Sequence, residues 1–316
     1  MALVSVVIPT YNYARYLPHS IESALAQTHR DVEVIVVDDG STDDTKEVVA
    51  RYGDRVVYRY QENIGLPKSR NQGCRIARGD YLAFLDADDV WLPDKLEKQL
   101  PILEADPQVG MVCCMMDRID DDGNPIPGLK PLRRPGETLA EMLRAGTALP
   151  STFLVRRAGF EQIGGFSERL EYMEDLFFGF QVAMRSKVVS LPDVLAHYRV
   201  HGDSLSHSKE KMVTGYIKAF ELLLEDVTAP ALRRLVLHNL ARYRYRLGKI
   251  RLSEGEFGAA RHLVAGALSA APMFGWGLDA PVGPLRRIVR AAKPYAVLLG
   301  LLVSPSSLRS HVKSEW

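Results

Sequence analysis

The sequence predicts an α/β fold with a doubly wound, mostly parallel sheet, followed by a C-terminal all-helical region. Within residues 4–103, short β-branched or aromatic runs alternate four times with segments that carry apolar residues three and four positions apart, the pattern of βαβ units. Acidic loops follow these runs, and the carboxyl ends of parallel strands share one edge of a sheet. From Ser208 onward the pattern is helical only. We therefore predict two domains, 1–207 and 208–316.

The alternating part is predicted to contain four strands and four helices. We place the strands at 4–8, 32–37, 56–60 and 81–85. The helices carry their apolar positions within 17–25, 48–52, 66–76 and 96–103. We expect Pro9 to end the first strand, and Ser41 with Asp44 to form the capping pair of the second helix.

The residues that follow predict further strands, one long helix and a variable loop. We place the strands at 109–116, 152–155, 188–191 and 194–200. The helix is predicted at Leu170–Arg185, and residues 117–135, rich in Gly, Pro and Asp, are typical of a loop. Residues 247–272 resemble one helical-repeat unit of the tetratricopeptide type. A single unit predicts a helical hairpin rather than an array.

Composition is that of an ordinary globular protein, 47% hydrophobic and 25% charged. The net charge is −8 over residues 1–208 and +9 over residues 209–316, which points to units with different partners. The cysteines, Cys74, Cys113 and Cys114, match neither a disulfide framework nor zinc spacing and indicate a reducing compartment. We find no secretory signal and no apolar run of the roughly 18 residues that span a bilayer, so we expect a cytoplasmic protein.

A basic stretch near the C-terminus raises the alternative of peripheral contact at the inner face of the membrane. Residues 285–293 mix four basic side chains with apolar ones, and an apolar run too short to span follows at 295–303. The basic residues are Arg286, Arg287, Arg290 and Lys293. Such a segment suits the interface of an anionic leaflet. Otherwise its apolar residues pack within the helical domain while the basic ones stay solvated.

Three carboxylates follow the strand predicted at 81–85, at Asp86, Asp88 and Asp89. Unpaired carboxylates repel one another and lose solvation near a core, whereas hard divalent cations favour such oxygens. The sequence therefore favours a site for Mg²⁺ or Mn²⁺ at this edge of the sheet. The alternative is a capped turn, in which Asp88 or Asp89 starts the helix that Pro93 opens.

Six segments in this order resemble the family 2 glycosyltransferases, which have the nucleotide-diphosphosugar-binding GT-A fold. They are Val4–Asn12, Val36–Asp43, Asn63–Gly73, Gly79–Asp89, Gly164–Phe166 and Glu174–Asp175. The resemblance covers residues 1–207 and includes the DxD motif. It implies inverting, metal-dependent transfer of one sugar from a nucleotide diphosphate sugar, with a UDP-sugar as the expected donor. The implied acceptor is a glycan or a lipid-linked acceptor, in bacterial surface polysaccharide or other glycan biosynthesis.

The resemblance assigns the nucleotide to the loops after the predicted strands. It implies that Pro9 and Tyr11 contact the base, that Asp39 reaches the polar edge of the base, and that Asp86 binds the ribose. An aromatic ring such as that of Tyr11 stacks on a base at low entropic cost. The alternative is that Tyr11 and Asp39 are ordinary loop residues.

Charged residues are assigned to the diphosphate and the metal. Lys68 and Arg70 are candidates for the diphosphate, and the alternative for them is a solvated helix face. The family pattern gives Asp88 to the Mn²⁺ or Mg²⁺ cofactor; Mg²⁺ typically keeps one or two protein carboxylates and takes other ligands from phosphates and water. His201, in a Tyr-Arg-x-His stretch, is a candidate metal ligand, although a lone loop histidine is more often structural.

Glu174 and Asp175 match the acidic pair of the family, which implies that Asp175 is the general base and Glu174 its support. Inverting transfer needs a carboxylate opposite the leaving diphosphate to accept the proton of the acceptor hydroxyl. The alternative is an exposed acidic pair at the start of a helix. The chain lacks the Gln-x-x-Arg-Trp signature of processive polymerases, so we expect non-processive transfer.

Two rival functions remain as alternatives. A sugar nucleotidyltransferase shares the broad fold, but Pro9–Asn12 is not the Gly-rich, Arg- and Lys-containing loop that such an enzyme needs. A catalytically silent sugar-nucleotide-binding scaffold is the second, and the intact Asp86, Asp88 and Asp175 count against it. We expect no nucleic-acid partner.

Overall fold

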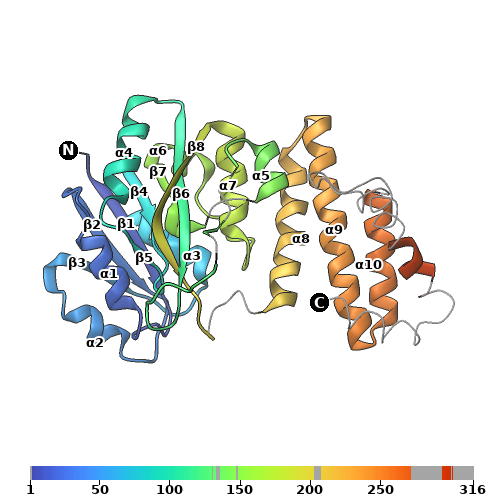
Figure 1. Ribbon diagram of the computed structural model, residues 1–316, viewed down its shortest axis with the longest axis horizontal. Coiled ribbons are helices and arrows are strands. Elements are labelled where there is room, and N and C mark those ends of the chain that lie inside the picture. Colours follow the sequence, from blue (N-terminus) through green and yellow to red (C-terminus); the bar gives the residue numbers. More distant parts are fainter. Residues whose placement is uncertain are drawn as a thin grey trace. The chain divides into compact units, whose positions relative to one another are not determined.

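The computed structural model (Figure 1) describes residues 2–129, 131–132, 136–146, 149–202, 208–271, 294–299 and 301. The chain forms two compact units, Met1–Ser204 and Leu205–Trp316. An eight-stranded sheet with helices makes up the first unit, and the described elements of the second unit are helices.

The sheet has the strand order β3-β2-β1-β4-β7-β6-β8-β5. The strands are β1 Val4–Thr10, β2 Val32–Asp38, β3 Val56–Tyr60, β4 Tyr81–Phe84, β5 Val90–Trp91, β6 Val109–Ile119, β7 Leu154–Arg156 and β8 Lys187–Arg199. The first four strands form a parallel block, and β6 is parallel to β8. β7 and β5 run antiparallel to the strands beside them. The sheet is therefore mixed and mostly parallel, as predicted.

Helices cover both faces of this sheet (Figure 1). They are α1 Leu17–Leu25, α2 Thr45–Ala50, α3 Leu66–Ile76, α4 Lys95–Ala105, α5 Leu139–Ala145, α6 Arg157–Ile163 and α7 Glu174–Arg185, with short 3-10 helices at Gly53–Arg55 and Pro150–Thr152. Alternate residues of a strand point to opposite faces of its sheet. On one face, Val4, Val6 and Ile8 of β1 pack in a single apolar cluster with residues of α1, α2 and α4.

The opposite face packs against α3, α6 and α7. Gly73 of α3 lies so close to β1 that a Cβ would come within 2.3 Å of Val7 Cγ1, which explains the glycine. Phe84 of β4 lies at the centre of an aromatic cluster, with ring centroids 4.9 to 6.5 Å from those of Phe160, Phe166 and Phe178. This cluster positions the start of α7, which carries part of the candidate site.

In the part of the second unit that the structure describes, the long helices are α8 Lys209–Asp226, α9 Pro230–Glu254 and α10 Phe257–Ala270. α9 ends at Gly255 in the left-handed conformation (φ 87°), and α10 then packs back on α9 as the predicted hairpin. Gly248 permits the close approach, since a Cβ there would lie 2.9 Å from Val264 Cγ2. α8 joins through Tyr216, whose ring stacks on that of Tyr243 at 4.1 Å.

No helix within the described residues is both long enough and apolar enough to cross a membrane. The basic residues considered for membrane contact lie outside the described part of the chain. They are Arg286, Arg287, Arg290 and Lys293. Their contact with an anionic leaflet stays a prediction.

Pro9 lies inside β1 rather than ending it, and Thr10 is the last residue of the strand. Leu85 N donates to Val7 O at 3.0 Å, so the main-chain groups of Val7 face β4. Pro9, two residues further on, faces the same side, but β4 ends at Phe84. The missing N–H of Pro9 therefore leaves no strand hydrogen bond unmade.

The capping pair expected for the second helix does not form. Asp44 is the N-cap of α2 without a side-chain hydrogen bond. Ser41 Oγ instead accepts a hydrogen bond from Asn12 N at 2.9 Å. Ser41 thus ties the loop after β2 to the loop after β1, a long-range contact that local spacing does not reveal.

The helix predicted at Leu170–Arg185 begins only at Glu174. Met173, immediately before it, adopts the left-handed conformation with a φ of 66°, which a right-handed helix cannot contain. The prediction was wrong about the first turn because apolar spacing carries no information about this backbone angle.

The strands predicted at 188–191 and 194–200 form one strand, β8, whose register with β6 is irregular near its middle. The short strand β5, which the periodicity did not predict, pairs with β8 and separates the carboxylates from α4. α4 has Asp94 as its N-cap. The capped-turn alternative for Asp88 or Asp89 is therefore wrong.

Candidate active site

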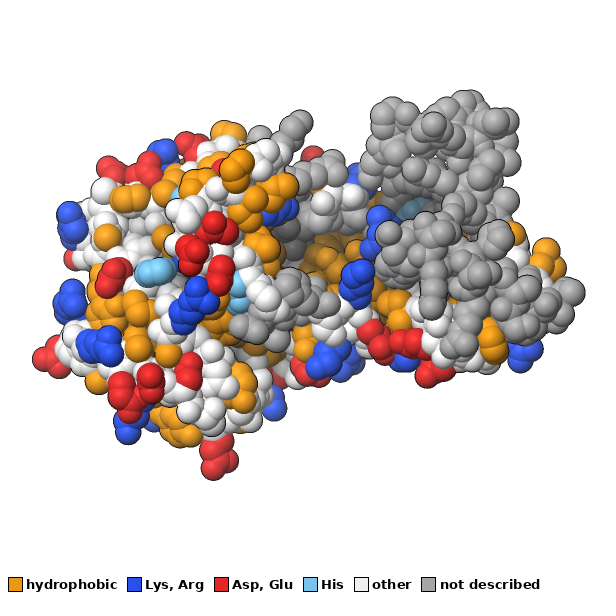
Figure 2. Space-filling model, turned by 60° about the horizontal axis from the view of Figure 1, so that its bottom comes forward, with side chains coloured by type: hydrophobic (Ala, Val, Ile, Leu, Met, Phe, Trp, Pro, Cys, Tyr) orange, Lys and Arg blue, Asp and Glu red, His pale blue; other side chains and the backbone are white. Residues whose placement is uncertain are grey.

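The candidate site lies at the edge of the sheet where the parallel strands β1, β2 and β4 end. Asp39 N donates to Thr10 O at 2.9 Å, which joins the loops after β1 and β2. Gly40, with a φ of 86°, lies so close to Asn63 that a Cβ would come within 2.9 Å of its main-chain nitrogen, so this turn requires glycine. Acidic side chains gather on one face of the first unit, beside histidine and basic side chains (Figure 2).

The residues predicted to bind the base differ in exposure. Tyr11 is 46% exposed, which leaves its ring open to a stacking partner, whereas Pro9 is buried. Asp39 is 4% exposed, and its carboxylate accepts hydrogen bonds from Gln61 Nε2 at 2.8 Å and Gly65 N at 2.9 Å. Asp39 therefore orders the segment that leads into α3. The contact of all three predicted residues with a base stays a prediction.

A buried arginine on α3 joins two carboxylates that are distant in the sequence. Arg70 is 2% exposed, its Nη2 lies 2.6 Å from Asp86 Oδ1, and its Nη1 donates to Glu174. Its guanidinium also lies 5.4 Å from the centre of the Phe166 ring. The alternative of a solvated helix face is therefore wrong for Arg70. Lys68, by contrast, is half-buried, and the roles of both at a diphosphate stay predictions.

The acidic pair lies at the N-terminus of α7. Burial raises the pKa of Glu174 to about 7, although the charge of Arg70 opposes the shift and the charge of Asp175 adds to it. Burial also raises the pKa of Asp175, again against the charge of Arg70. Glu174 is 4% exposed, so this is not an exposed helix-capping pair. Met173 before it holds a conformation that costs energy in non-glycine residues and recurs at functional sites.

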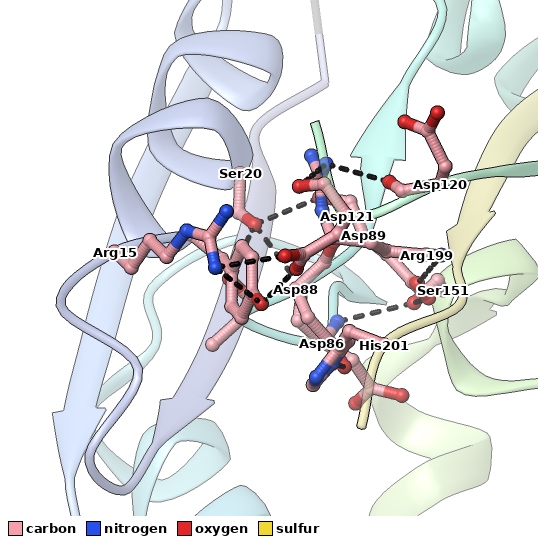
Figure 3. A network of polar contacts seen from close by, with 12 residues as sticks. Arg15, Ser20, Asp86, Asp88, Asp89, Asp120, Asp121, Ser151, Arg199 and His201 are labelled. Atoms are coloured by element: carbon pink, nitrogen blue, oxygen red, sulfur yellow. Dashed lines mark hydrogen bonds and ion pairs between the residues drawn. The ribbon is translucent and has the colours of Figure 1, made fainter. Parts of the chain in front are cut away.

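Asp88 and His201 form a second pair, drawn in Figure 3. His201 Nε2 lies 2.9 Å from Asp88 Oδ2, and the His201 side chain is 1% exposed. The rings of Tyr13 and Tyr16 lie against the imidazole, with centroid distances of 5.7 and 4.7 Å. The Nδ1 atom of His201 is buried without a hydrogen-bond partner. The structure thus brings together the two residues that the sequence predicted as metal ligands.

This pair of donors fits a divalent cation that keeps few protein ligands. One carboxylate oxygen and one imidazole nitrogen face each other, and Mg²⁺-type sites take their remaining ligands from substrate phosphates and water. Among the described residues, no set of three or more His, Cys, Asp or Glu side chains could hold a metal. Asp88 and His201 therefore offer such an ion two protein ligands, and water or a substrate phosphate would supply the others.

Two serines that no motif singled out fix the loop after β4. Ser151 Oγ donates to Asp89 Oδ2 at 2.5 Å and accepts from Asp86 N at 3.1 Å. Ser20 Oγ, on α1, donates to Ala87 O at 2.8 Å. Burial raises the pKa of Asp89 well above its usual range. Only the three-dimensional contacts identify these serines, because neither belongs to a recognisable sequence motif.

Comparisons with known proteins agree with this architecture. The model of glycosyl transferase family 2 matches residues 5–164. An uncharacterised glycosyltransferase of Rickettsia prowazekii is 32% identical over 231 residues, 72% of this chain and 73% of the relative. WfaP of Escherichia coli, a UDP-Glc:alpha-D-GlcNAc-diphosphoundecaprenol beta-1,3-glucosyltransferase, is 38% identical over 108 residues, 34% of this chain and 43% of the relative. The crystal structure of S. aureus TarS 1–349 in complex with UDP-GlcNAc has a TM-score of 0.68 at 19% identity, over 94% of this chain and 90% of that chain.

The mostly parallel sheet with helices on both faces, together with the similarity to TarS, shows a GT-A fold, and a helical region follows it. The chain belongs to glycosyl transferase family 2. The resemblance drawn from the six sequence segments is thereby confirmed, and with it the assignment as a glycosyltransferase.

Proposed function

We propose that the chain is an inverting, metal-dependent glycosyltransferase that moves one sugar from a UDP-sugar to a hydroxyl of a lipid-linked glycan. The observation that carries the proposal is the link made by Arg70, which joins Asp86, two residues before the predicted metal ligand Asp88, to the acidic pair on α7. Donor-side and acceptor-side carboxylates then lie around one buried cation. The UDP-sugar and diphosphoundecaprenol-linked substrates in the name of WfaP, and UDP-GlcNAc in the TarS complex, support the choice of donor and acceptor.

The donor is bound by the loops at the carboxyl edge of the sheet. Tyr11 stacks on the base with its exposed face, and Asp86 accepts a ribose hydroxyl with the oxygen that Arg70 leaves open. Lys68 supplies a positive charge for the diphosphate. Asp39 keeps the loop before α3 in place and offers the base the one lone pair, on Oδ2, that its three accepted hydrogen bonds leave.

Asp88 and His201 are the residues that would hold the divalent cation, and the ion would stabilise charge on the leaving diphosphate. Asp88 is 17% exposed at its side chain, so its carboxylate can reach a bound ligand. The rings of Tyr13 and Tyr16 pack against the imidazole of His201 and restrict its rotation. Through the ion, Asp88 and His201 would help to hold the diphosphate of the donor.

Asp175 accepts the proton of the acceptor hydroxyl. Its Oδ1 accepts a hydrogen bond from Leu176 N at 2.7 Å, which leaves Oδ2 for the proton. As the acceptor oxygen bonds to the anomeric carbon, the bond from that carbon to the phosphate oxygen breaks, and its electron pair leaves with the nucleoside diphosphate. Attack opposite the leaving group inverts the anomeric centre. The raised pKa of Asp175 makes it a stronger base than an ordinary aspartate.

A panel of UDP- and GDP-sugars incubated with the full chain tests the proposal. We expect slow release of UDP from one donor in Mn²⁺ or Mg²⁺, none in a chelator, and faster release with a lipid-linked glycan acceptor. Nuclear magnetic resonance of the product should report an inverted anomeric centre. Binding of a donor without release of UDP would instead identify a silent scaffold, and a retained anomeric configuration would exclude Asp175 as the base of a single displacement. A lipid-linked acceptor would bring the reaction to the cytoplasmic face of a membrane.

A further inference from the structure

Arg199 is a second buried arginine at the site, and the steps proposed above do not use it. It is the last residue of β8, lies two positions before His201, and is 1% exposed. Figure 3 shows it beside Asp88, Asp89 and Asp120. Burying a guanidinium is costly unless its donors are satisfied, so its contacts identify its role.

The guanidinium of Arg199 holds main-chain oxygens from two loops. Its Nε donates to Asp88 O at 2.9 Å. Its Nη1 donates to Asp120 O at 3.2 Å and to Asp121 O at 3.1 Å. Its Nη2 donates to His19 Nδ1 on α1 at 3.2 Å. Three separate segments of the chain are therefore fixed to one planar group.

The remaining contacts of Arg199 keep this group in place. The ring of Tyr16 lies 5.2 Å from the guanidinium carbon, within range of a cation–π interaction. The main-chain nitrogen of Arg199 donates to Asp89 Oδ1 at 3.2 Å. Within the described residues, the guanidinium makes no ion pair with a carboxylate. Its charge therefore stays next to the acidic loop instead of being neutralised by a single partner.

We infer that Arg199 is a positioning residue that sets the separation of the two metal-ligating side chains. Its side chain fixes the main chain of Asp88, while its own main chain carries His201 two residues later. A change at Arg199 would move one ligand relative to the other without removing either. This inference rests on the proposed assignment of Asp88 and His201 to a divalent cation.

The test measures Mn²⁺ affinity directly, by electron paramagnetic resonance of free Mn²⁺ titrated with the full chain in the absence of donor. Arg199→Lys keeps the charge and the apolar stem but cannot reach all four acceptors. We expect the Kd for Mn²⁺ to rise about 10- to 100-fold, the range seen when residues behind a metal ligand are changed. In turnover assays the KM for Mn²⁺ should rise while kcat recovers at saturating Mn²⁺.

Arg156 of β7 provides a matched control. Its guanidinium also donates to main-chain oxygens, those of Val109 at 3.0 Å, Asp106 at 3.2 Å and Leu103, and to the hydroxyl of Tyr81 at 3.4 Å. It lies opposite Tyr81, at the start of β4 rather than at its carboxyl end. We expect Arg156→Lys and Arg199→Lys both to lower the Tm, and Arg156→Lys to leave the Kd for Mn²⁺ unchanged.

If Arg199→Lys does not fold, His19→Ala tests the same inference. His19 is exposed on α1, so its replacement leaves the packing of the core intact. It removes one acceptor of the guanidinium, and we expect a Kd for Mn²⁺ about two- to fivefold higher, the size of one hydrogen bond. If the wild type binds Mn²⁺ and every folded variant has the same Kd for Mn²⁺, the inference about Arg199 is wrong and the metal assignment stands. A wild type that binds no Mn²⁺ and turns over in a chelator would overturn the metal assignment and the inference with it.

Discussion

Arg70 Nη2 lies 2.6 Å from Asp86 Oδ1, and the other arm of the same guanidinium bonds Glu174. The three residues come from α3, from the loop after β4 and from the start of α7. Because Arg70 is 2% exposed, its charge is little screened by water. The cation thus couples the two halves of the site and opposes the rise that burial causes in the pKa of Glu174.

Replacing Arg70 alone should therefore cost more than replacing it together with its partner. We expect Arg70→Met to lower the free energy of unfolding by about 3 to 5 kcal/mol, because Glu174 is left buried without its cation. Adding Glu174→Leu should recover part of that loss, since no uncompensated carboxylate then remains buried beside α3. Urea unfolding of the wild type, the single variants and the double variant gives the coupling energy. Losses that add to within about 0.5 kcal/mol would show that the two residues are independent.

The second prediction concerns the acidic pair, Glu174 and Asp175. Asp175→Asn keeps the shape but cannot accept a proton, so kcat should fall about 10²- to 10⁴-fold while the KM for the donor hardly changes. Glu174→Gln should instead lower stability, because it removes one of the two carboxylate charges that Arg70 faces. Steady-state kinetics and thermal unfolding of both variants separate the two effects. A larger loss of kcat in Glu174→Gln, with its Tm preserved, would reverse the assignment of base and support.

The third prediction concerns Asp88 as a ligand of the divalent cation. Asp88→Ala should abolish turnover that depends on Mn²⁺ and leave the fold intact, because the Asp88 carboxylate contributes charge rather than core packing. His201 would lose its partner at 2.9 Å, and the Tm of the variant should change little. Asp54→Ala, in the 3-10 helix before β3, is a control of equal charge outside the site. Wild-type rates for Asp88→Ala at limiting Mn²⁺ would exclude Asp88 as a ligand.

The sequence predicted the sheet well because each strand of the parallel block is a β-branched or aromatic run that needs only its own periodicity. The carboxylates were found for a similar reason, since Asp86 and Asp88 are adjacent to a strand end. The sequence indicated Arg70 as a candidate site residue but not its ion pair with Glu174, because Glu174 lies on a helix far along the chain. Ser151 and Arg199 were missed as site residues, since their importance arises entirely from which loops the fold brings against them.

A buried lysine at the start of α4 is another residue whose surroundings the sequence did not reveal. Lys95, the first residue of α4, is 0% exposed, and its Nζ lies 4.0 Å from the centre of the Trp91 ring. It donates to Gln99 Oε1 at 2.8 Å. The amide of Gln99 donates in turn to Thr152 O at 2.9 Å. Burial lowers the pKa of Lys95 from 10.5 to about 8.

This shift predicts how stability depends on pH. Below pH 8 the folded and the unfolded chain both carry the Lys95 proton, and the fold bears the full cost of burying the charge. Between about pH 8 and 10.5 the folded chain has released the proton while the unfolded chain still binds it, so stability rises with pH. The gain amounts to about 3 kcal/mol by the top of this window.

Lys95→Met removes this titration and keeps the apolar contact with Trp91. Urea unfolding should be followed by the fluorescence of Trp91, with Trp276 and Trp316 replaced by Phe in both proteins. Relative to Lys95→Met, the wild type should gain about 3 kcal/mol in free energy of unfolding between pH 7 and pH 10.5, because all other groups titrate equally in the two chains. A difference between them that stays constant across this range would mean that Lys95 is already neutral at pH 7 or is not buried in solution.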